Sequence, residues 1–78
     1  MGVQAYVLIQ TSVGRSTAVA KEISNLPGVI NAADATGPYD VIVKVDAADM
    51  DALGQMIVTR LQLVDGVTRT LTCPIVRL

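Results

Sequence analysis

The segment Gly37-Pro38-Tyr39-Asp40 holds groups that are chemically suited to bind a small charged molecule. Gly37 permits close approach to the backbone, and N–H groups that converge in such a turn carry partial positive charge that attracts a carboxylate. The carboxylate of Asp40 can in turn hold an ammonium group through a charge-assisted hydrogen bond. The same residues equally fit a plain hairpin turn in which Asp40 bonds local backbone. Both interpretations stay open at this stage.

Residues suited to catalysis are few in this chain. It has no histidine and one cysteine, Cys73. General acid–base chemistry near neutral pH most often uses histidine, or a carboxylate or lysine tuned by burial, and a cysteine nucleophile needs a base beside it. Asp34, Asp40 and Asp46 are spaced six apart but fall in different predicted elements, which favours turn and capping roles. We therefore expect that the protein is not an enzyme.

The use of cysteine and histidine also limits metal and redox chemistry. A single cysteine cannot form an internal disulfide, and a chain without histidine lacks the usual zinc constellations. We therefore expect no metal and no cofactor. Cys73 is predicted to be a small buried hydrophobe rather than a reactive thiol.

The composition is typical of one small domain that associates with itself. The chain has 78 residues and a mass of 8.2 kDa, so we expect a single domain over residues 1–78. Hydrophobic residues make up 51%, more than one small core easily hides, which predicts apolar subunit contacts. A net charge of −1 argues against direct binding of nucleic acid. Without a run of about 20 apolar residues or a secretion signal, we expect a cytoplasmic protein that makes no membrane contact.

Three elements are predicted in the first half of the chain. Alternating apolar residues predict a strand over residues 3–11. Apolar residues at helical spacing then predict a helix over 15–25, which ends at Leu26-Pro27-Gly28. Residues 29–36 form a weaker strand candidate because alanine and asparagine lower β-propensity. Gly37-Pro38 is a strong turn signal after it.

The second half of the chain repeats this order. Residues 41–45 are the clearest strand, and the short glycine-containing connection before them predicts an antiparallel hairpin. Residues 46–51 supply several possible N-caps for a helix whose apolar stripe closes at Asp65-Gly66. Residues 67–77 alternate again, and Pro74 cannot donate a ladder hydrogen bond. This last strand is therefore predicted at a sheet edge.

Strand, helix, strand, strand, helix, strand is the order of the ferredoxin-like fold. The predicted class is α+β, with an antiparallel four-stranded sheet and both helices on one face. The apolar residues Tyr6, Leu8 and Ile42 cannot all be hidden in that helix-covered layer. We therefore expect a dimeric α/β sandwich or a larger ring of dimers.

Three motifs follow one another along the chain. They are Leu26-Pro27-Gly28-Val29, Thr36-Gly37-Pro38-Tyr39-Asp40 before Val41-Ile42-Val43, and Gly66-Val67-Thr68-Arg69-Thr70. Together they resemble the effector domain of Lrp/AsnC-type transcription regulators, the domain for regulation of amino-acid metabolism (RAM), and the resemblance covers nearly the whole chain. Family members usually carry a helix-turn-helix domain before this one, whereas here Met1 is followed almost at once by the first strand. The expectation is a stand-alone member without a helix-turn-helix domain, to which DNA binding is not carried over.

The resemblance also implies an assembly and a ligand site. Sheets pack together to form dimers, dimers associate into rings, and an amino-acid effector binds near the dimer-to-dimer contact beside the turn between the second and third strands. The residues that it places there are Gly37, Pro38, Tyr39 and Asp40, with Met50, Thr70 and Thr72 as secondary candidates.

Each secondary candidate has a structural alternative. The hydroxyls of Thr70 and Thr72 can donate or accept hydrogen bonds, but an exposed strand face chosen for β-propensity explains them as well. Packing is the alternative for Met50. We predict an amino-acid-sensing and oligomerisation module in transcription regulation. There are two alternatives: a purely structural partner of full-length Lrp/AsnC regulators, or a small ferredoxin-like dimeric enzyme.

Overall fold

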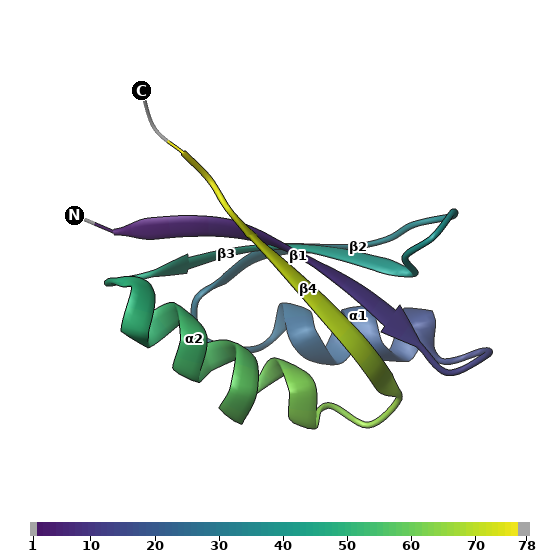
Figure 1. Cartoon of the computed structure of the whole chain (residues 1–78). Coiled ribbons are helices and arrows are strands. Elements are labelled where there is room, and N and C mark those ends of the chain that lie inside the picture. The colour runs from purple at the N-terminus through teal and green to yellow at the C-terminus, as the bar shows by residue number, and fades with distance from the viewer. Residues whose placement is uncertain (1, 77–78) are drawn as a thin grey trace.

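A computed structural model describes residues 2–76 as an antiparallel sheet with both helices on one face (Figure 1). The strand order is β2-β3-β1-β4, and each neighbouring pair is antiparallel. This is the α+β, ferredoxin-like βαββαβ arrangement that the sequence predicts. Its elements are β1 (Val3–Thr11), α1 (Ser16–Ser24), β2 (Val29–Asp34), β3 (Val41–Ala47), α2 (Met50–Thr59), the 3-10 helix η1 (Leu61–Leu63) and β4 (Val67–Pro74).

The core lies between the helices and one face of the sheet. Every second residue of β1 and β3 is buried there, as expected for side chains that alternate between the faces of a strand. The helices close the layer with the apolar stripes predicted from their spacing. The buried side chains are Ala5, Val7 and Ile9 of β1, Val41, Val43 and Val45 of β3, Val19, Ala20 and Ile23 of α1, and Leu53, Ile57, Leu61 and Val64 from α2 onward.

The other face of the sheet is open, as predicted. Tyr6, Ile42 and Leu71 are exposed on it by 44%, 39% and 47%. Leu8 pairs with Ile42 on one side and with Leu71 on the other, so these apolar side chains form a continuous band. The Lys44 ammonium lies over the Tyr6 ring, 5.9 Å from its centre. Residues 2–76 of the same chain leave this band uncovered.

Strand β4 turns Thr70 and Thr72 toward the helices and Cys73 toward the open face. Thr72 pairs with Val7, whose side chain is buried on the helix side, whereas Cys73 pairs with Tyr6 and is exposed. The predicted burial of Cys73 is therefore wrong for the single chain. The alternative of an exposed threonine face is wrong as well, because Thr70 and Thr72 are half-buried.

A β-bulge explains this difference. Val67 pairs with Thr11 and packs against the core, but Arg69 pairs with Gln10, so Thr68 is an extra residue between them. An inserted residue reverses which side chains face the core beyond it. Val67 faces the core, whereas Leu71 and Cys73, two and three pairs of residues further along, face the open side of the sheet. Edge placement of β4, predicted from its proline, is confirmed.

The second helix is shorter than predicted. It ends at Thr59, and Arg60 has φ −126° and ψ −63°, which lies outside the helical region. Leu61 stays buried because η1 continues the apolar stripe with a tighter turn. At the other end Asp49 is the N-cap, and its Oδ1 accepts a hydrogen bond from the N–H of Ala52 at 2.8 Å. No helix within residues 2–76 is long and apolar enough to cross a membrane.

Candidate functional site

The turn between β2 and β3 is tied to the end of β1. The N–H of Asp40 donates to the carbonyl oxygen of Ile9 at 2.9 Å, and Nε2 of Gln10 donates to the carbonyl oxygen of Pro38 at 3.0 Å. Gly37 has φ +121°, and a Cβ built on it would meet nothing within 4 Å. Backbone conformation rather than crowding therefore requires this glycine, and the backbone around it is open to an approaching molecule.

The carboxylate of Asp40 bonds a neighbouring strand. Its Oδ2 accepts a hydrogen bond of 2.8 Å from the N–H of Thr11, at the point where β1 and β4 lose register. Asp40 therefore bonds a backbone N–H, as in the hairpin-turn interpretation. Its partner, however, is 29 positions away and not in the turn itself. A carboxylate has two oxygens and about four acceptor positions, so this bond leaves capacity for a further donor.

Met50 and Thr72 come together in a cavity of about 300 Å³ between α2 and β4. Met50 is the first residue of α2 and is 55% exposed, whereas Thr72 contributes a hydroxyl from the half-buried side of the strand. The rest of the lining is almost wholly apolar. It consists of Leu53, Gly54, Ile57, Val58 and Pro74.

Thr70 belongs to a different, more polar cavity of about 420 Å³ beside η1. Nε2 of Gln62 donates a hydrogen bond of 3.0 Å to its Oγ1. The other lining residues come from the start of β4 and include Arg69. Thr70 therefore does not share the cavity of Met50 and Thr72.

The predicted site residues thus fall into two groups at opposite ends of β3. The turn containing Asp40 comes directly before Val41, whereas Met50 follows Ala47, and Figure 1 shows the turn and the start of α2 at the two ends of the molecule. Six strand steps of about 3.3 Å separate Val41 from Ala47 by roughly 20 Å. One amino acid cannot span this distance. Within a single chain the two groups therefore do not form one site.

The aspartates considered for chemistry have different hydrogen-bond partners. Asp34 and Asp40 are near one another in the hairpin, since the N–H of Ala35 donates to the carbonyl oxygen of Asp40 at 2.8 Å. Asp34 nevertheless accepts a hydrogen bond of 3.0 Å from Oγ1 of Thr17, whereas Asp40 accepts from Thr11, and Asp46 is exposed at the far end of β3. Across residues 2–76 there is no group of three or more histidine, cysteine or acidic residues placed to hold a metal ion.

The structure adds lining residues that the sequence analysis did not single out. Gly54 and Val58 follow Met50 at intervals of four, so all three lie on one side of α2. This spacing was visible in the sequence, but the contribution of Pro74 was not, because it depends on the register between β1 and β4.

An open ferredoxin-like sheet with a ligand-sized cavity between its second helix and an edge strand defines a small binding domain. Residues 4–77 match the family described as the Lrp/AsnC ligand binding domain. The chain belongs to this family, whose ligand-binding domains are found in transcription regulators.

Two curated relatives show where such a domain occurs. The chain is 31% identical over 75 residues to an uncharacterized HTH-type transcriptional regulator of Pyrococcus furiosus, a match over 92% of this chain and 50% of the regulator. It is 42% identical over 57 residues to a homocitrate synthase of Sulfurisphaera tokodaii, over 73% of this chain and 12% of the synthase. The chain thus spans half the length of the regulator and a small part of the enzyme.

Solved structures share the fold. A Thermus thermophilus protein superimposes with a TM-score of 0.90 at 32% identity, over 97% of this chain and 95% of that protein. A transcriptional regulator of Neisseria meningitidis, solved in complex with L-Met, has a TM-score of 0.85 at 18% identity, over 96% of this chain and 50% of that regulator. At that identity the second likeness concerns the fold alone.

Proposed function

We propose that the chain senses an amino acid or a closely related small molecule at a site completed by two subunits, and regulates transcription through the assembly that it forms. The observation that carries this proposal is the division of the candidate residues. The turn with Asp40 and the cavity with Met50 and Thr72 lie at opposite ends of β3. Two copies of the chain can supply one group each.

The two groups complement each other chemically. In the proposed site, the remaining acceptor capacity of Asp40 holds the ammonium group of the effector, and the open backbone at Gly37 approaches its carboxylate. The effector side chain enters the mostly apolar cavity, where the Thr72 hydroxyl is the polar contact. The complex of the Neisseria regulator with L-Met supports an amino acid as the ligand class.

Assembly is the proposed route from binding to regulation. Dimers pack through the open apolar face of the sheet and associate further, so that an effector at a contact between subunits shifts the population of assemblies. We propose that residues 1–78 act as one domain in the cytoplasm and join full-length Lrp/AsnC regulators. The Thermus protein, matched over 95% of its own length, supports a single domain of this size.

We propose a regulatory rather than a catalytic role. The match to the homocitrate synthase occupies 12% of that enzyme, which suits an appended domain better than a catalytic core. Within residues 2–76, the carboxylates of Asp34 and Asp40 accept hydrogen bonds from Thr17 and Thr11, which supports structural rather than catalytic roles for them.

The test is a thermal-shift screen of the common amino acids, followed by mixing of two variants. A ligand that binds only the folded state raises the melting temperature by mass action. Asp40→Asn damages the turn half, and Thr72→Val damages the cavity half. When the two variants are co-expressed, some sites combine an intact turn with an intact cavity, so the mixture is expected to regain tight binding that both variants lack alone.

Thr59→Val is the matched control, since Thr59 is an exposed threonine of α2 that lies outside the cavity of Met50 and Thr72. Its binding should equal that of the unchanged protein. A mixture without regained binding contradicts a site shared by two subunits. If no amino acid raises the melting temperature while the chain still assembles with a full-length regulator, the structural-partner alternative is correct.

A further inference from the structure

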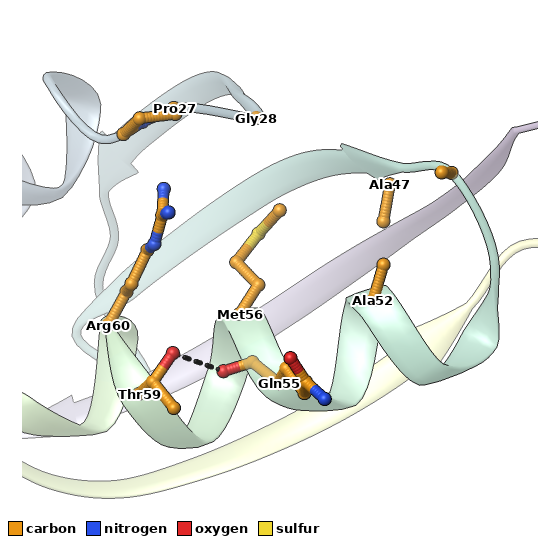
Figure 2. Close-up of a pocket in the computed structure, with 9 residues that line it drawn as sticks. Pro27, Gly28, Ala47, Ala52, Gln55, Met56, Thr59 and Arg60 are labelled. Carbon is orange, nitrogen blue, oxygen red and sulfur yellow. Dashed lines mark hydrogen bonds between the residues drawn. The ribbon is translucent and has the colours of Figure 1, made fainter.

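A second cavity lies on the other side of α2, away from the cavity of Met50 and Thr72. It has a volume of about 330 Å³ and is bounded by the α1–β2 turn, the β3–α2 connection and α2 itself (Figure 2). Ala52, Met56 and Arg60 follow one another at intervals of four and so present one side of the helix to it. Its other lining residues are Pro27, Gly28, Ala47, Ala48, Gln55 and Thr59.

The wall formed by the α1–β2 turn is fixed in place. The N–H of Asp46 donates to the carbonyl oxygen of Gly28 at 2.8 Å, which ties the turn to β3. Gly28 has φ +85°, and a Cβ there would overlap the Cε of Met56 and lie 3.0 Å from the carbonyl oxygen of Asp46. The glycine therefore allows the turn to close over Met56, and the small side chains of Ala47 and Ala52 leave the remaining space open.

Arg60 is the one charged residue in this lining. Figure 2 shows its side chain rising from the end of α2 toward Pro27. Among residues 2–76 its guanidinium has no ion pair and no hydrogen bond, whereas Arg15 pairs with Asp65 at 3.2 Å. The lining contains no aspartate or glutamate. The cavity thus combines an unpaired cation with mostly apolar walls.

We propose that this cavity binds a small aliphatic carboxylate that carries no ammonium group. Guanidinium binds carboxylate through two parallel N–H···O bonds, and the apolar walls around Met56 suit a short hydrocarbon chain. An amino acid is a poor occupant, because its ammonium group would enter a lining without a carboxylate to pair with it. The volume suits a small molecule. This site goes beyond the proposed effector site and does not depend on it.

Two other roles for these residues compete with the proposal. Arg60 is the C-cap residue of α2, and a cation at the C-terminal end of a helix stabilises the negative end of the helix dipole, so Arg60 serves α2 even without a ligand. A second copy of the chain is another occupant of the cavity. Both give outcomes that differ from those of ligand binding.

The test is a two-dimensional amide NMR titration with 4-methylpentanoate and, separately, L-leucine, which has the same carbon skeleton plus an ammonium group. 4-Methylpentanoate is expected to shift the amide signals of Gly28, Ala48 and Ala52, and L-leucine to leave them unchanged. Arg60→Gln should weaken this binding about tenfold or more, as expected when a charge-assisted bond is lost. Ala52→Leu should abolish it by filling the cavity.

Arg69→Gln is the matched control, since Arg69 is an exposed arginine outside this cavity. It should leave the titration unchanged. Unchanged affinity in Arg60→Gln, with or without a lower melting temperature, overturns the proposal and leaves the helix role. Equal shifts with L-leucine, shifts confined to Gly54 and Thr72, or ligand-free shifts that depend on protein concentration also overturn it.

Discussion

Asp40 serves the fold through one carboxylate oxygen and, in the proposed site, the ligand through its remaining acceptor capacity. Asp40 accepts a hydrogen bond from the N–H of Thr11 at the bulge. This N–H thereby gains an acceptor where the regular pairing of β1 with β4 is interrupted. The proposed ammonium contact needs the negative charge, whereas the bond to Thr11 needs only an oxygen. Substitutions that remove these properties one at a time therefore separate the two roles.

Asp40→Asn is expected to keep folding stability and lose ligand. Its amide oxygen still accepts from Thr11, but the lost charge should weaken amino-acid binding by about 1.5–3 kcal/mol, or roughly tenfold to a hundredfold. Asp40→Ala removes the acceptor and should lower the free energy of unfolding by about 1–3 kcal/mol as well. Calorimetric titration and urea unfolding measure the two effects. Lost stability with unchanged affinity in Asp40→Asn would mean that Asp40 serves the turn alone.

Substitution of Gly28 tests how closely the α1–β2 turn packs on Met56 in the wall of the second cavity. Gly28→Ala should lower the free energy of unfolding by about 1–2 kcal/mol from the left-handed backbone alone, and by more because Met56 and the Asp46 carbonyl lie in the way. Gly14→Ala is the control, since Gly14 has a similar φ of +78° and nothing within 4 Å of a built Cβ. Urea unfolding of both variants compares the losses. Equal losses would show that the turn does not close over Met56.

At the level of elements, the N-cap of α2 positions the start of the proposed effector cavity. Asp49→Ala should lower the free energy of unfolding by about 0.5–2 kcal/mol, because the N–H of Ala52 loses its acceptor. Asp49→Asn keeps an acceptor and is expected to stay near the unchanged protein. Because Met50 follows the cap directly, the alanine variant should also bind the effector less tightly in the same titration. An alanine variant as stable as the asparagine variant would contradict this role for the cap.

The sequence predicts elements whose pattern is set locally and misses those set by pairing. β1 and β3 alternate between two faces, so their buried residues follow from period two alone. The end of α2 could not be predicted because the stripe through Leu53, Ile57 and Leu61 continues past the break at Arg60. The facing of Cys73 depends on the bulge at Thr68, which is a property of two strands together.

The candidate site shows the same limit. Its residue types were visible in the sequence, and so was the turn that presents Asp40. The distance between that turn and Met50 follows only from the length and placement of β3. The bond that engages Asp40 connects residues 29 positions apart, which no local pattern reveals.

For the whole molecule, the proposed assembly forms through the open face of the sheet. Leu71→Glu places a charge in the apolar band and should convert an assembly into a species of 8.2 kDa in analytical ultracentrifugation. Val13→Glu is the control, because Val13 is fully exposed at the β1–α1 connection, outside the band. Cys73 shares the open face, so its thiol should react faster in the Leu71 variant. If the unchanged protein already sediments as a species of 8.2 kDa, this prediction is contradicted.

A site divided between subunits makes ligand affinity a property of the assembly. Leu71 lies in neither the turn nor the cavity of Met50, yet Leu71→Glu should abolish amino-acid binding, because a monomer offers the two groups only at opposite ends of β3. By reciprocity the effector should raise the average mass of the unchanged protein at concentrations where it partly dissociates. Sedimentation with and without the effector, and titration of the Leu71 variant, test both statements. A monomer that binds the effector with full affinity would place the whole site within one chain.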